Sequence, residues 1–125
     1  MSGTPFEGTP FEQIAQLDRL IHEPARLAIL VALAACERAD FLFLQRITGL
    51  TKGNLSAHLS RLQEAGLVEI EKRFVDKKSQ TLARLSRPGR EAVASYWREM
   101  AALQQSATRW RPATPAVAKP APSVS

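Results

Sequence analysis

Apolar residues in the middle of the chain recur with the period of an α-helix. The segment 52–65 contains leucines at positions i, i+4 and i+7, which lie on one face of a helix. These are Leu55, Leu59 and Leu62. Residues 41–47 predict a shorter helix, entered through a residue or two of strand, and Gly49 can end it in the left-handed conformation. A short helix, a glycine-containing turn and an amphipathic helix together predict a helix-turn-helix.

Two further helices are predicted before this motif. Residues 11–21 have one apolar face, made of Phe11, Ile14, Leu17 and Ile21. Pro24 suits the first turn of the next helix, because a backbone N–H at that position would have no acceptor within the helix. Residues 24–36 are apolar on nearly every side, so this helix is expected at the centre of the domain.

The pattern after residue 66 changes from helical to alternating. Apolar and charged residues alternate over residues 68–73, and the alternation returns over residues 81–86. The intervening residues 75–80 are polar and rich in turn-forming types, and they include two lysines. This segment therefore predicts a β-hairpin with a basic tip.

A final helix is predicted over residues 87–106. Ser86 is placed to cap it, and Pro88 suits its first turn. One side of this helix carries Ala92, Val93, Tyr96, Trp97, Met100 and Leu103. The apolar side can belong to the core, to a dimer interface or to the wall of a ligand pocket, and a dimer interface is the preferred interpretation.

The two ends of the chain differ from the middle in composition. Residues 3–12 read GTPFE twice in tandem, and their Pro, Gly and Thr favour a loose arm, which is assigned to residues 1–10. Residues 107–125 contain four prolines and few large hydrophobic side chains, so a disordered tail is expected. The predicted domain therefore spans residues 11–106.

Length and composition limit the class of protein. A chain of 125 residues suits one domain with a modest core. Cys36 is the one cysteine, which excludes an internal disulfide and a multi-cysteine metal site and leaves packing as its expected role. No run of 18 apolar residues and no secretory signal pattern is present, so no membrane partner is expected and a cytoplasmic location is predicted.

Positive charge is concentrated in the helix-turn-helix and the hairpin. Residues 51–90 hold nine Lys or Arg and four acidic residues, a net charge of +5, whereas residues 1–50 have a net charge of −2. A basic excess on one segment is typical of proteins that bind nucleic acid. A generally basic surface is the alternative explanation.

The side of the 52–65 helix opposite the leucines is unusual for a solvated surface. It carries Asn54, Ser56, Ala57, Ser60 and Arg61. Solvated helix faces are usually filled by Glu and Lys. Small polar residues with one Arg instead permit a close approach to base edges and phosphates. This face therefore predicts contact with double-stranded DNA.

Several of these residues also have an interpretation without DNA. Asn54 and Ser56 are ordinary polar types for the start of a helix, and Arg61 can pair with Glu64 or Glu37. His58 lies at the edge of the leucine stripe and can bond within the protein or to a phosphate.

The start of the helix and the hairpin provide further candidates for phosphate contacts. Thr51 and Lys52 lie at the helix N-terminus, where free N–H groups favour anions, although Thr51 has a capping role with or without DNA. Arg73, Lys77 and Lys78 belong to the hairpin, and simple solvation is the alternative for its tip.

The sequence contains no recognisable catalytic or cofactor motif. Paired carboxylates, a Ser/His/Asp set, a glycine-rich phosphate loop and metal-ligand spacings are all missing from it. An enzyme is therefore not expected, and neither is a cofactor.

With these elements placed, the chain resembles the bacterial winged helix-turn-helix transcriptional regulators, in particular the small single-domain group of the MarR/ArsR kind. The resemblance covers roughly residues 12–105, and its most specific part is NLSAHLSRLQEAGLV at residues 54–68. It implies a mainly α fold with a small β-hairpin wing, in the order α-α-α-α-β-β-α. Metal-sensing members carry paired Cys before the recognition helix or His with acids on the last helix. Residues 41–50 have no Cys and residues 87–106 have no His, so no metal site is expected.

The resemblance also implies a homodimer that binds a palindromic DNA site and usually represses. It places residues 51–61 in the major groove and the wing on the adjacent backbone or minor groove. The expected dimerisation residues are Phe11, Ile14, Leu17, Ile21, Val93, Tyr96, Trp97, Met100 and Leu103. A small-molecule effector is compatible with this class. The alternative function is a winged helix used for protein–protein assembly, which would place large apolar residues on the exposed side of the 52–65 helix.

Overall fold

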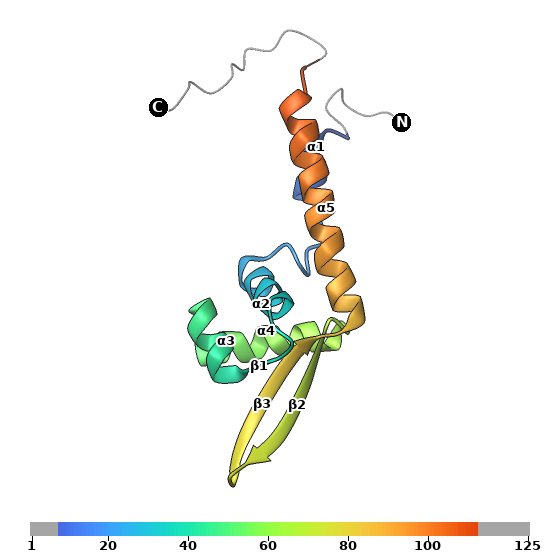
Figure 1. Ribbon diagram of the computed structural model, residues 1–125. Coiled ribbons are helices and arrows are strands. Elements are labelled where there is room, and N and C mark those ends of the chain that lie inside the picture. Colours follow the sequence, from blue (N-terminus) through green and yellow to red (C-terminus); the bar gives the residue numbers. More distant parts are fainter. Residues whose placement is uncertain (1–7, 113–125) are drawn as a thin grey trace.

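The computed structural model describes residues 8–112, which form five helices and a small antiparallel sheet (Figure 1). The elements in chain order are α1 (Pro10–Ala15), α2 (Pro24–Ala34), β1 (Ala39–Asp40), α3 (Phe41–Thr48), α4 (Lys52–Glu64), β2 (Val68–Val75), β3 (Lys78–Leu85) and α5 (Arg87–Arg109). The predicted winged helix-turn-helix order is confirmed, including the short strand before α3. We refer to the β2–β3 hairpin as the wing.

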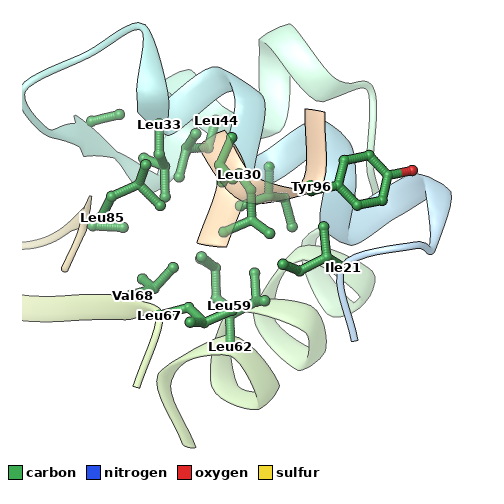
Figure 2. Packing of buried hydrophobic residues seen from close by; sticks show 14 of the residues in the cluster. Ile21, Leu30, Leu33, Leu44, Leu59, Leu62, Leu67, Val68, Leu85 and Tyr96 are labelled. Carbon is green, nitrogen blue, oxygen red and sulfur yellow. The ribbon is translucent and has the colours of Figure 1, made fainter. Parts of the chain in front are cut away.

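The hydrophobic core surrounds α2 and holds α4 in place. Six side chains of the core are almost completely buried: Ile29, Leu30, Leu33, Leu44, Leu55 and Leu62. They come from α2, α3 and α4, and Leu67, Val68 and Leu85 close the core from the sheet side (Figure 2). Burying one such side chain contributes roughly 1.5–3 kcal/mol. The leucine stripe predicted for residues 52–65 therefore anchors α4, and its other side faces solvent.

Local signals define the turn between α3 and α4. Gly49 ends α3 with a φ of 71°, in the left-handed region. Thr51 precedes α4, and its side chain accepts a hydrogen bond from the Asn54 N–H at 3.1 Å. Both capping predictions are confirmed, as is the cap that Ser86 forms on α5 through the Gly89 N–H.

The sheet has the order β1-β3-β2, and the wing extends away from the helices (Figure 1). Its register runs from Val68 opposite Leu85 to Val75 opposite Lys78. The turn is Asp76-Lys77, with φ values of 52° and 66°. The prediction of a longer turn over residues 75–80 is wrong, because residues 78–80 are polar but still pair with β2.

The N-terminal region departs most from the prediction. The helix expected over residues 11–21 begins at Pro10 and ends at Ala15. Thr9 caps it by accepting a hydrogen bond from the Glu12 N–H at 3.2 Å, and the Glu12 carboxylate accepts from the Gly8 N–H, just before the cap, at 2.7 Å. The second GTPFE copy is thus the start of a helix, and the expected loose arm does not include residues 8–10. Asp18 accepts from the Leu20 N–H at 2.9 Å and thereby favours a turn over further helix.

The C-terminal helix is longer than expected. α5 continues to Arg109, so residues 107–109 are helical instead of part of a tail. The rest of the predicted tail from residue 113, and residues 1–7 of the predicted arm, lie outside the described residues. The upper part of α5 passes beyond the α2–α4 body, with α1 packed beside it (Figure 1). The Trp110 ring at its end meets the Phe11 ring edge-on, with 5.3 Å between the ring centroids.

Candidate nucleic-acid interface

The side of α4 opposite its buried leucines forms the centre of the candidate interface. We call this surface the polar face of α4: Asn54, Ser56, Ala57, Ser60 and Arg61, all exposed. Among residues 8–112, no hydrogen bond or ion pair occupies the side chains of Asn54, Ser56, Ser60 or Arg61. The alternative pairing of Arg61 with Glu64 or Glu37 is therefore not observed. These polar groups are available to an external partner.

The N-terminal end of α4 adds exposed groups suited to an anion. Thr51 and Lys52 are both exposed at the first turn, where N–H groups without intrahelical partners favour negative charge. Gly53 follows them, and a Cβ at this position would project into open space. The beginning of the helix is thus open to a close approach from outside.

His58 has a partner inside the protein. Its Nδ1 lies 3.4 Å from a guanidinium nitrogen of Arg26, a long and weak contact. The same guanidinium donates to the carbonyl oxygens of Leu20 at 2.6 Å and Arg19 at 3.1 Å. His58 is also partly buried. Of the two interpretations of His58, the intramolecular one agrees with this geometry.

A groove separates the polar face of α4 from the wing. Its volume is about 910 Å³. Polar residues from both sides line it, including Lys52, Ser56, Ser60 and Gln63 of α4 and Lys72 and Lys78 of the wing. The lining also includes two acidic residues, Asp40 and Asp76, and apolar residues such as Phe41, Leu42 and Ile70. The three lysines, which lie on both sides of the groove, are the groups that suit a polyanionic strand. Lys72 and Gln63 were not predicted as site residues, although alternation along β2 places Lys72 on the same side as Ile70, which also lines the groove.

Charged side chains near the base of the wing form ion pairs, whereas the lysines nearer its tip form none with the described residues. At the base, Arg84 lies 2.8 Å from Glu69, and Arg38 lies 3.6 Å from Glu71. Three lysines nearer the tip, Lys72, Lys77 and Lys78, have no acidic partner within 4 Å in the described part of the chain. The predicted residue Arg73 is exposed and donates to the Gln80 side chain at 3.1 Å. The free positive charge of the wing is therefore concentrated toward its tip.

Most of the predicted dimerisation residues lie in the interior of a single chain. Five of them are buried: Leu17, Ile21, Val93, Tyr96 and Leu103. Ile14 and Met100 are partly buried against the same core, because α1 packs along α5 of its own chain. These seven side chains pack within one chain, so most of the two end faces is already covered without a second copy. Phe11 and Trp97 remain 49% and 46% exposed.

Tyr96 connects α5 with the loop before α2. Its hydroxyl lies 2.7 Å from Nδ1 of His22. Burial raises the pKa of Tyr96 above its ordinary value, because the charged phenolate would lose hydration. Tyr96 is therefore protonated at neutral pH. This contact gives both residues a structural role.

Residues 8–112 contain neither a metal-binding cluster nor a membrane-spanning helix. No group of three or more His, Cys, Asp or Glu side chains there is arranged to hold a metal ion. No helix in this range has the length and apolar character needed to cross a bilayer. Cys36 is a free, partly buried thiol.

Comparison with known proteins agrees with this geometry. The family model described as a winged helix DNA-binding domain matches residues 25–104. The uncharacterized protein MJ0432 of Methanocaldococcus jannaschii is 31% identical over 88 residues, which cover 70% of this chain and 96% of that protein. A transcriptional regulator homologue from Pyrococcus horikoshii OT3 is 26% identical with a TM-score of 0.70, over 77% of this chain and 94% of that one. RV1404 from Mycobacterium tuberculosis shares the fold at 22% identity and a TM-score of 0.63, over 83% of this chain and 70% of that one. The chain belongs to the winged helix DNA-binding domain family.

Proposed function

We propose that this protein is a sequence-specific transcriptional regulator that binds a palindromic DNA operator as a homodimer and represses. The observation that carries the proposal is the polar face of α4, whose hydrogen-bonding groups are exposed and unoccupied within residues 8–112. A protein–protein assembly module would need large apolar side chains on this face, and α4 exposes small polar ones there instead.

The dimensions of α4 suit the DNA major groove. Its 13 residues make a helix roughly 20 Å long, and the major groove admits one α-helix. An Asn amide can pair with adenine through two hydrogen bonds, and an Arg guanidinium can do so with guanine. Asn54 and Arg61 are the corresponding candidates on the polar face of α4, and Ser56 can bond to either base type. Thr51 and Lys52 would then contact phosphate at the start of the helix.

The groove beside α4 provides a path for the phosphate backbone. Lys52 lies on its helix side, and Lys72 and Lys78 lie on its wing side. A backbone in this groove would place the wing next to the adjacent minor groove. AbfR, which has the same fold at 18% identity and a TM-score of 0.61, has been solved bound to DNA.

Dimer formation is supported by the exposed length of α5. This helix has 23 residues and extends beyond the α2–α4 body (Figure 1). Trp97 is 46% exposed on it, between the exposed small residues Ala94 and Ala101 at helical spacing. A two-fold contact through this stripe would bury Trp97 and present two copies of α4 to half-sites about one duplex turn, roughly 34 Å, apart.

The specificity of α4 can be tested with genomic fragments selected by the wild-type protein. The double variant Asn54→Ala/Arg61→Ala is expected to bind the selected site more weakly by about 1–3 kcal/mol for each base-reading side chain removed, and to bind random DNA almost as well as wild type. Fluorescence anisotropy gives both affinities. Arg98→Ala, which removes an exposed Arg from α5, is the matched control. An unchanged ratio of specific to random affinity in the double variant would show that α4 does not read sequence.

The dimer can be tested separately by sedimentation at micromolar concentration. Trp97→Glu places a charge in the proposed two-fold contact and should give monomers that keep the fold and lose affinity for an inverted repeat. Ser95→Glu, at an exposed position two residues earlier on α5, adds the same single negative charge and is the control. A wild-type monomer that binds one half-site tightly would contradict the dimer.

A further inference from the structure

The wing exposes an aromatic ring among its unpaired cations. Phe74 is 79% exposed, more than any other large hydrophobic side chain on the surface of residues 8–112. A single exposed apolar residue needs no explanation by itself. Phe74, however, lies between Lys72 and the tip residues Lys77 and Lys78, which have no acidic partner within 4 Å in the described chain. Asp76 in the turn is the one acidic residue of this stretch, so residues 72–78 keep a net charge of +3. An exposed ring in a segment of net positive charge fits an anionic partner that also offers an apolar interior.

Phe74 lies near the outer end of β2, where the wing has passed beyond the residues of the core. Phe74 is opposite Ser79, and Lys72 is opposite Thr81. Side chains alternate along a strand, so Phe74 lies on the same side of β2 as Ile70 and Lys72. Both of these residues line the groove beside α4. The small Ser79 across the strand leaves the ring uncovered.

We propose that Phe74 inserts as a wedge between base pairs in the minor groove beside the site bound by α4, and thereby bends the DNA. The inference rests on the proposed DNA-binding function and deepens it. Apolar side chains inserted from the minor groove unstack a base step and kink the duplex toward the major groove. The flanking lysines supply the phosphate contacts that hold a bent duplex against the wing.

A wedge of this kind also affects which sequences bind. Pyrimidine–purine steps such as TA and CA unstack at the least cost in free energy. The preferred operator should therefore carry such a step where the wing meets the minor groove, outside the bases read by α4. This preference would depend on Phe74 and be independent of Asn54 and Arg61.

The wedge is tested on a DNA fragment selected by the wild-type protein. Energy transfer between dyes at the two ends of the fragment measures bending, and 2-aminopurine at the candidate step measures unstacking. Wild-type protein is expected to bend the fragment and raise the 2-aminopurine signal. Phe74→Ser should lose both effects, and Phe74→Leu should keep most of both. Val31→Ser is the matched control, because Val31 is a 40% exposed apolar residue of α2 that does not line the groove.

The outcomes separate the wedge from DNA binding itself. Phe74→Ser changes no charge, so it should keep the salt dependence of wild-type binding. Specific binding without a bend, or equal bending by wild type and Phe74→Ser, would overturn the wedge and leave the proposed function intact. Failure of the wild-type protein to bind any duplex would overturn both. Binding to anionic vesicles that depends on Phe74, with no effect on DNA bending, would assign the ring to a membrane surface and overturn the wedge.

Discussion

The polar face of α4 and the tip of the wing are held in different ways. Three buried leucines fix α4 against the core, and its exposed groups are mostly neutral and short. The outer half of the wing is exposed from Glu71 through Ser79 and carries lysines and Phe74. Under the proposed function, the firmly anchored helix would select sequence, and the less buried hairpin would add charge and deform the DNA.

The largest expected effect is on the anchoring of α4. Leu62→Ala removes a completely buried side chain and should lower the free energy of unfolding by about 2–5 kcal/mol, because a cavity is left in the core. Val75→Ala on the exposed wing should change it by no more than about 0.5 kcal/mol. Urea denaturation followed by circular dichroism measures both. Equal losses would show that the wing is as deeply integrated in the fold as α4.

The next effect concerns the charge of the wing tip. Lys77→Ala/Lys78→Ala should weaken binding to all DNA sequences alike and flatten the plot of log affinity against log salt. The slope should decrease by roughly 0.9 for each phosphate that the variant no longer neutralises. Arg84→Ala is the control, since Arg84 is paired with Glu69 at the base of the wing. A wild-type slope in the double variant would show that Lys77 and Lys78 do not contact DNA phosphates.

A smaller effect is expected at the start of α4. Thr51→Ala removes the cap on the Asn54 N–H and should lower the free energy of unfolding by about 1 kcal/mol. Thr51→Ser keeps the hydroxyl and should restore most of that loss. Thermal and urea unfolding of the three proteins measure the difference. If Ala and Ser variants unfold alike, the hydroxyl at residue 51 does not stabilise the helix.

The smallest effect concerns the ion pair at the base of the wing. Glu69→Gln separates Glu69 from Arg84 without a large change of shape, and both side chains are more than half exposed. Exposed ion pairs contribute about 0–1 kcal/mol, so stability should change little. The removal of a negative charge beside Arg84 should slightly strengthen DNA binding at low salt. A loss above about 2 kcal/mol would mean that this pair is part of the folded framework.

Short-range signals explain why much of the fold was predictable from sequence. The leucine spacing, Gly49 and Thr51 act over one or two helical turns, and the structure has the helix, the left-handed turn and the cap where they were expected. The alternation of β2 and β3 likewise predicted a hairpin, although the turn is shorter than the polar residues suggested. The solvent exposure of the polar face of α4 also follows, because the opposite face must be buried.

Long-range contacts decide which apolar faces and charged side chains pair with each other, and these pairings could not be predicted from the sequence. Apolar faces on residues 11–21 and on α5 are equally compatible with a second copy and with each other, and the folded chain pairs α1 with its own α5. The sequence alone does not show that Lys72 lines the groove, because this depends on the packing of β2 beside α4. The ion pair between Arg84 and Glu69 likewise depends on the pairing of β2 with β3. The sequence by itself determined the helices, caps, hairpin and polar face of this protein, since these depend on neighbouring residues. The tertiary structure decided which apolar faces and charges stay free, because that depends on distant segments packed together.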